Sequence, residues 1–162
     1  MFIEVRLIRK LRVTAALLTA TNVLAGEEMP HKLPGSLFYD KPFEVIPVGF
    51  SAIGSTAPPT YENAGHNNNL SFVVTGDGVV VINGGAAYGL DKALHDEIKA
   101  VTKQPVKLVF NENGQAHAVL GNDYLAAQGT PIVAHVDAAH EYESFGGSIL
   151  EGMQRYNRDH AD

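Results

Sequence analysis

The sequence predicts an α/β domain built on a mixed β-sheet. Residues 70–83, "LSFVVTGDGVVVIN", are two β-branched runs joined through a glycine-rich turn, which is typical of a β-hairpin. From residue 84 onward, helical and strand-like patterns alternate, and this alternation favours helices packed on a sheet. A chain of 162 residues is long enough to bury one core of ordinary size, so we expect one folded domain.

The segment before the hairpin is less regular. Residues 43–56 are rich in β-forming residues but contain Pro47 and Gly49, so we expect a bent or edge strand there. Residues 57–69 are rich in Pro and Asn, and we expect a loop.

The second half predicts three helices and two strands. Leu90, Leu94, Ile98 and Val101 recur on one face of an amphipathic helix. We expect the last helical stretch to be interrupted at Gly146–Gly147. The predicted elements, in order, are a helix at 90–103, a strand at 105–111, a helix at 117–129 closed by Gly129, a strand at 130–135 and a helical stretch at 136–162.

The N-terminus has the pattern of a secretory signal peptide. Four basic residues lie in the first 12, and an uncharged apolar run follows over 13–25 and ends with Val23 and Ala25. Small residues at these positions suit cleavage after Ala25, and the run is shorter than the roughly 20 residues of a membrane span. We therefore expect 1–25 to be a signal peptide of a periplasmic or secreted protein, with an uncleaved anchor or a misassigned start as alternatives.

Composition narrows the function classes. Removing the signal peptide takes away four basic residues and one acid, which changes the formal net charge from −6 to −9. Such a surface repels phosphate backbones, so we expect no nucleic-acid partner. The chain contains no Cys, which excludes disulfides and thiolate metal sites. Residues 26–42 contain three prolines and read as an extended leader to a domain at 43–162.

Three segments together resemble a known family. They are "NNNLSFVVTGDGVVVINGG", "GLDKALHDEIKAVTKQPVKLVF" and "NENGQAHAVLGNDYLAAQGTPIVAH", which resemble the first half of the metallo-β-lactamase superfamily in order and spacing over roughly residues 43–145. The resemblance implies one half of an αβ/βα sandwich, a mixed sheet with helices on its outer face. It also implies that 43–162 is a truncated domain, since the family's later metal ligands have no counterparts here.

The family's zinc-binding motif is replaced in this chain. Where the family has His-x-His-x-Asp-His, the resemblance places Asn113, Gln115, His117 and Ala118, and the acidic residue that supports this loop corresponds to Asn83. Zinc prefers imidazole, thiolate or carboxylate ligands, and neutral amides bind it weakly. We therefore expect no metal cofactor, with zinc or another divalent metal as the cofactor if the chain is instead a hydrolase with an unusual site.

Other side chains in this region offer different chemistry. Glu112 and His117 lie on one predicted loop and form a candidate acid/base pair. His117, His135 and His140 are an alternative metal-ligand set, although their spacing matches no strong motif. As structural alternatives, Asp137 would cap the last helix, His135 would be hydrogen-bonded at a strand end and His140 would lie on the surface.

These observations leave two functional hypotheses open. The first is an exported metallo-β-lactamase-like domain without catalytic activity that acts as a binding or interaction module for an unknown small molecule or protein. The second is a metal-dependent hydrolase with an unusual site, completed across a dimer. A single sheet without a partner sheet would expose an apolar face, so we also expect a homo-oligomer, formed through that face or by exchange of the C-terminal helix.

Overall fold

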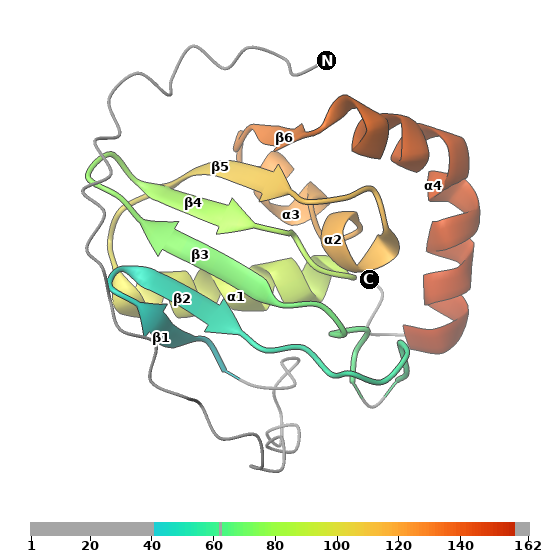
Figure 1. The fold of residues 1–162 in the computed structure, drawn as a ribbon, viewed down its shortest axis with the longest axis horizontal. Helices are drawn as coiled ribbons and strands as arrows, with labels where there is room; N and C mark the ends of the chain where they lie inside the picture. Colours follow the sequence, from blue (N-terminus) through green and yellow to red (C-terminus); the bar gives the residue numbers. More distant parts are fainter. Residues whose placement is uncertain (1–40, 62, 158–162) are drawn as a thin grey trace, which may run out of the picture.

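The computed structural model describes residues 41–61 and 63–157, so the predicted signal peptide and most of the leader lie outside the described residues. Ten elements follow one another along this part of the chain (Figure 1). Their bounds are β1 Phe43–Ile46, β2 Gly49–Ala52, β3 Leu70–Val74, β4 Val79–Ile82, α1 Tyr88–Val101, β5 Val106–Asn111, α2 Ala116–Val119, α3 Asp123–Ala126, β6 Ile132–Ala134 and α4 Val136–Asn157.

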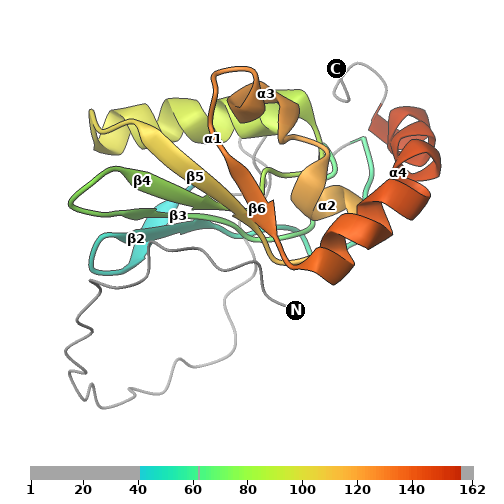
Figure 2. The same cartoon turned by 90° about the horizontal axis from the view of Figure 1, so that it is seen from above.

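The six strands form one mixed sheet in the order β1-β2-β3-β4-β5-β6. Strands β1 to β4 pair antiparallel, whereas β4, β5 and β6 pair parallel. Helices α1 and α3 lie over one face of the sheet, and α2 and α4 lie beyond the ends of the strands (Figure 2). This arrangement confirms the predicted α/β class and the mixed sheet with helices on one face.

The hydrophobic core lies between α1 and the sheet. Helix α1 buries Leu90, Leu94 and Ile98 at helical spacing, as the sequence predicts. These side chains pack with buried residues of the central strands, among them Phe72 and Val109. The face of the sheet that α1 covers is therefore shielded from water mainly by apolar contact.

The segment 43–56 forms a hairpin and not the single bent strand that the sequence predicts. Ile46 pairs with Gly49, which leaves Pro47 and Val48 as a two-residue turn. The backbone of Val48 is left-handed with φ 61°, and its N–H donates to Glu44 Oε1 at 2.9 Å. Because Pro cannot donate to the ladder, it serves as a turn residue here, while β1 takes the edge of the sheet as expected.

The predicted helix at 117–129 is broken into α2 and α3. Gly121 lies against the turn that follows β4, where its N–H donates to the Gly85 carbonyl at 2.9 Å. A Cβ on Gly121 would collide with the carbonyl oxygen of Gly84. This close backbone contact, which the sequence does not reveal, bends the chain between the two short helices.

Helix α4 is continuous through Gly146 and Gly147, so the predicted interruption is wrong. Glycine in a helix interior costs about 1 kcal/mol relative to alanine, and the helix of 22 residues absorbs this cost. Within residues 41–61 and 63–157, no helix combines the length and the apolar character needed to cross a membrane.

Candidate functional site

The candidate site lies at the edge of the sheet where β4, β5 and β6 end. The carboxyl ends of parallel strands meet at one edge, which brings the turns that follow them together. Asn83 follows β4, the loop 112–115 follows β5, and His135 follows β6. These are the positions that the sequence singles out. The first and the last of them, Asn83 and His135, are more than 50 residues apart in the sequence.

Asn83 supports the loop directly. Its side chain is only 1% exposed, and its Oδ1 accepts a hydrogen bond from the Glu112 N–H at 3.1 Å. Its backbone is left-handed with φ 66°, a conformation that Asn tolerates better than most residues. An amide at this position therefore does the supporting work that the family resemblance assigns to an acidic residue.

The loop is also closed on itself. Asn113 Oδ1 accepts a hydrogen bond from the Gln115 N–H at 2.9 Å, which is an Asx turn. Gln115 lies immediately before α2 with an extended backbone, and it is exposed. The side-chain oxygen of Asn113 is therefore already bonded to the backbone of its own loop.

Helix α4 contributes a residue that the sequence analysis does not identify. The Gly114 N–H donates to Glu141 Oε2 at 3.3 Å, which joins the loop to the second turn of α4. Gly114 is buried, and a Cβ there would collide with the carbonyl oxygen of Ala138. Glu141 and Gly114 are 27 positions apart, so no local pattern connects them.

His117 is the imidazole of this site. It is half-buried on α2, and its Nε2 lies 3.4 Å from Asn113 Nδ2. An amide nitrogen can only donate, so this contact requires an unprotonated Nε2 and a proton on Nδ1. Burial lowers the pKa of His117, and the charges of Glu112 and Glu141 oppose this shift. The imidazole is therefore neutral at neutral pH, with two carboxylates nearby.

Ala118 serves the fold. Its side chain is fully buried, and its carbonyl oxygen accepts a hydrogen bond from the Gly84 N–H at 2.8 Å. This bond fixes α2 against the turn after β4. The position packs against neighbours on all sides and offers no ligand.

The side chains of this edge do not fit a zinc ion. Among the described residues, no three His, Cys, Asp or Glu side chains come together in a group that could hold a metal ion. Asn113 and Gln115 offer neutral amides, and the oxygen of Asn113 is already engaged within the loop. Zinc binds imidazole, thiolate or carboxylate, usually through at least three of them, so this donor set is unsuited to it.

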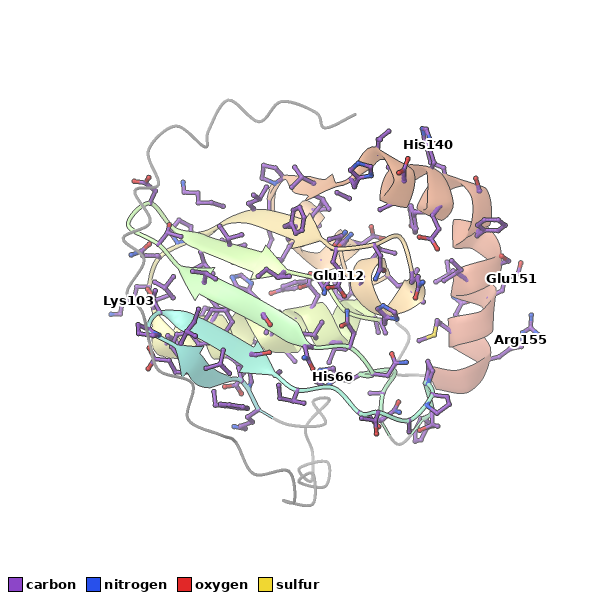
Figure 3. The ribbon with its side chains drawn as sticks, in the orientation of Figure 1. His66, Lys103, Glu112, His140, Glu151 and Arg155 are labelled. Atoms are coloured by element: carbon purple, nitrogen blue, oxygen red, sulfur yellow. The ribbon has the colours of Figure 1, made fainter. Side chains whose placement is uncertain are left out.

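His135 and His140 have separate surroundings. His135 Nδ1 accepts a hydrogen bond from the Asp137 N–H at 3.2 Å, so His135 and not Asp137 caps the first turn of α4. The hydrogen-bonded role expected for His135 is thereby confirmed. His140 is exposed and lies on the outer side of α4 (Figure 3).

Two buried ionisable side chains lie outside the predicted site. His66, in the loop before β3, is 1% exposed, and burial lowers its pKa to about 4 against opposing backbone hydrogen bonds of Ala52 and Asn68 (Figure 3). Asp91, on α1, is fully buried, and burial raises its pKa to about 8, which the backbone of Leu125 offsets only in part. Asp91 follows the core position 90, but a lone acid in a helical pattern gives no sign of burial.

Another histidine, His95 on α1, is half-buried, with its Nδ1 3.2 Å from the Tyr124 hydroxyl. Burial lowers the pKa of His95.

Comparison with solved structures places this geometry in a known fold. The metallo-β-lactamase from Pontibacter korlensis is similar with a TM-score of 0.54 and 20% identity, over 65% of this chain and 48% of that chain. The metallo-β-lactamase from Erythrobacter litoralis is similar with a TM-score of 0.53 and 14% identity, over 65% of this chain and 45% of that chain. Over this part of the chain the fold is metallo-β-lactamase-like.

The likeness is limited to the fold. No family model and no curated protein matches the sequence. The chain spans less than half the length of each of the two solved structures. Sequence identity this low leaves the activity to be argued from the site, since one fold hosts many functions.

Proposed function

We propose that this chain is an exported domain with a metallo-β-lactamase-like fold that acts by binding and not by hydrolysis. The observation that carries the proposal is the loop 112–115. Its polar groups bond to one another, to Asn83 and to Glu141, in the place where the family resemblance puts metal ligands.

The replaced ligands argue against hydrolysis because hydrolysis of this kind depends on a metal. A hydrolase of this kind needs a bound hydroxide, and lowering the pKa of water to about 7 requires the metal. Asn113, Gln115 and Ala118 supply no imidazole or carboxylate. His117 remains, and one imidazole does not make a zinc site.

One feature of the site favours a second function. The carboxylates of Glu112 and Glu141 both act on the pKa of His117. A neutral imidazole with nearby carboxylates has the minimum for acid/base catalysis, or for an unusual metal site completed by a second copy. Glu112 is exposed, so it lacks the burial that tunes a catalytic carboxylate.

Metal analysis of the chain purified without chelators separates the two functions. We expect a metal content far below one ion per chain, unchanged in His117→Ala, because the remaining donors are amides. His140→Ala, a change at an exposed histidine on α4, is the matched control. Near-stoichiometric zinc, iron or manganese that is lost in His117→Ala and kept in His140→Ala would replace the binding function with the hydrolase.

Export is tested separately. The proposal rests on the basic segment, the apolar run and the small residues up to Ala25. Mass spectrometry of the exported product is expected to give a chain that begins at Gly26. An intact N-terminus in the membrane fraction would instead identify an uncleaved anchor.

A further inference from the structure

The sheet has one face that α1 does not cover, and we call it the open face. Residues paired directly across strands share a face, and Ser51 and Ser71 confirm this because their hydroxyls hydrogen-bond at 2.9 Å. The strand pairing gives one row across the open face, made of Phe43, Ser51, Ser71, Ile82, Phe110 and Val133.

The two paired rows of the open face carry no charge. The next row contains Val73, Val80 and Leu108, again paired across neighbouring strands. Neither row includes an acid or a base, and the two serines bond to each other. A sheet with one solvated face ordinarily alternates apolar and polar residues, so uncharged rows of this kind are typical of a buried face.

No described element packs on this face. Figure 2 shows α1 and α3 on the opposite side of the sheet and α4 beyond the strand ends. The side chains of Phe43 and Phe110 are 47% and 44% exposed, at two separate points of one row. Large apolar side chains exposed on an uncharged part of a sheet face are typical of an interaction site.

We propose that the open face is the interface between two copies of this chain, packed sheet against sheet. The two paired rows have no charge with which to select a different protein, while a two-fold dimer needs only a surface that complements itself. Two twisted sheets of equal size pack face to face about 10 Å apart.

The charges at the strand ends indicate how the copies are oriented. Lys103 lies before β5 and Glu112 after it, at opposite ends of the strand (Figure 3). A two-fold axis that crosses the strands brings the Lys103 end of one copy to the Glu112 end of the other. An axis along the strands would place like ends together, with the acidic ends repelling each other.

Sedimentation velocity of the full chain over a roughly hundredfold range of concentration tests the dimer. We expect a dimer whose dissociation constant rises roughly 100-fold or more in Phe110→Glu, because each copy would bury an unpaired carboxylate. Val101→Glu is the matched control, since Val101 is 46% exposed at the end of α1, on the covered side of the sheet, and it should leave the dimer unchanged.

Two further variants keep the test decisive. Ile46→Lys changes an edge-strand side chain that is 62% exposed and pairs through Gly49 with the row of Val73, and it should weaken the dimer even if Phe110→Glu fails to fold by circular dichroism. Phe145→Glu, at a side chain 59% exposed on α4, tests exchange of the C-terminal helix instead. A wild-type monomer at all concentrations, or a dimer lost only in Phe145→Glu, would overturn the proposal. Neither result depends on metal content, so the proposed binding function is judged separately.

Discussion

The layer beneath α1 and the loops at the strand ends lie on the same strands, yet they are held together by different forces. Leu90, Leu94 and Ile98 close the first region by apolar contact with the sheet. The second region is closed by hydrogen bonds of Asn83 and Glu141 to the loop after β5. The fold depends on the first region, and the chemistry of any site depends on the second.

This difference would explain how the fold persists if, as we propose, the metal ligands of the family are replaced in this chain. Apolar contacts tolerate many sequences if volume and pattern are kept, which agrees with similarity at 14–20% identity. Hydrogen bonds in a loop can be supplied by amides as readily as by carboxylates or imidazoles. Asn83 and Asn113 hold the loop in this way, and neither side chain offers a donor that zinc prefers.

Two buried ionisable side chains, one in the α1 layer and one in the loop before β3, give the pH dependence of stability two opposing parts. In the α1 layer, the folded pKa of Asp91 is about 8, above its ordinary value of 3.8. The contribution of Asp91 to stability is present below pH 3.8 and is lost as the pH rises toward 8, because the unfolded chain ionises first. In the loop before β3, the pKa of His66 is about 4, below its ordinary value of 6.5. The contribution of His66 is present above pH 6.5 and is lost as the pH falls toward 4.

The largest effect is expected from Asp91→Asn. Between about pH 4 and 6.5 the two groups cancel in the wild type, with smaller additions from His95 and His117, whose pKa values are also lowered. Between pH 6.5 and about 8, Asp91 is the one of these groups whose protonation differs between the folded and unfolded chain, so the wild-type free energy of unfolding should fall by about 1.4 kcal/mol per pH unit in this range. Asp91→Asn should abolish this fall, as measured by urea denaturation.

The exposed aspartate of the β3–β4 turn provides the control. Asp77→Asn removes an acid from the same protein without changing the α1 layer, and it should keep the wild-type slope. Parallel slopes in the wild type and Asp91→Asn above pH 6.5 would show that Asp91 is ionised within the fold. Asp91 would then not be the source of the pH dependence assigned to the α1 layer.

The elements that the sequence predicts well are those set by local chemistry. The turn at 75–78 is fixed by its own residues, since Gly78 has φ 144° and Thr75 bonds to its carbonyl oxygen. Helix α1 follows from the spacing of its apolar positions. The α/β class and the edge at which the candidate residues gather follow from the order of these elements.

The features that the sequence analysis misses are long-range contacts. The break between α2 and α3 comes from Gly121 meeting the turn at Gly84 and Gly85, more than 30 residues earlier. The burial of Asp91 depends on α3, and the role of Glu141 depends on Gly114. In each case the partner lies on another element, and no periodicity or motif in the sequence predicts the contact.

The smallest effect is expected from substitutions of Glu141. They separate two contributions of this side chain to the strand-end loop, its hydrogen bond and its charge. The carboxylate accepts the Gly114 N–H and also raises the pKa of His117. Glu141→Gln keeps an acceptor for Gly114 but removes the charge, whereas Glu141→Ala removes both. Loss of the hydrogen bond should cost about 1 kcal/mol of unfolding free energy, so only Glu141→Ala should show it in urea denaturation.

Loss of the Glu141 charge should change the pKa of His117 and leave the free energy of unfolding unchanged. In both Glu141 variants the pKa of His117, followed by NMR, should fall below its wild-type value, since one of the two opposing carboxylates is gone. Glu143→Gln, an exposed acid on the same helix, should leave that pKa unchanged. If His117 titrated identically in wild type and Glu141→Gln, α4 would have no electrostatic link to the loop. The strand ends would then be held by backbone geometry and Asn83 alone, and the imidazole would have lost one of the two acids that make an acid/base function conceivable.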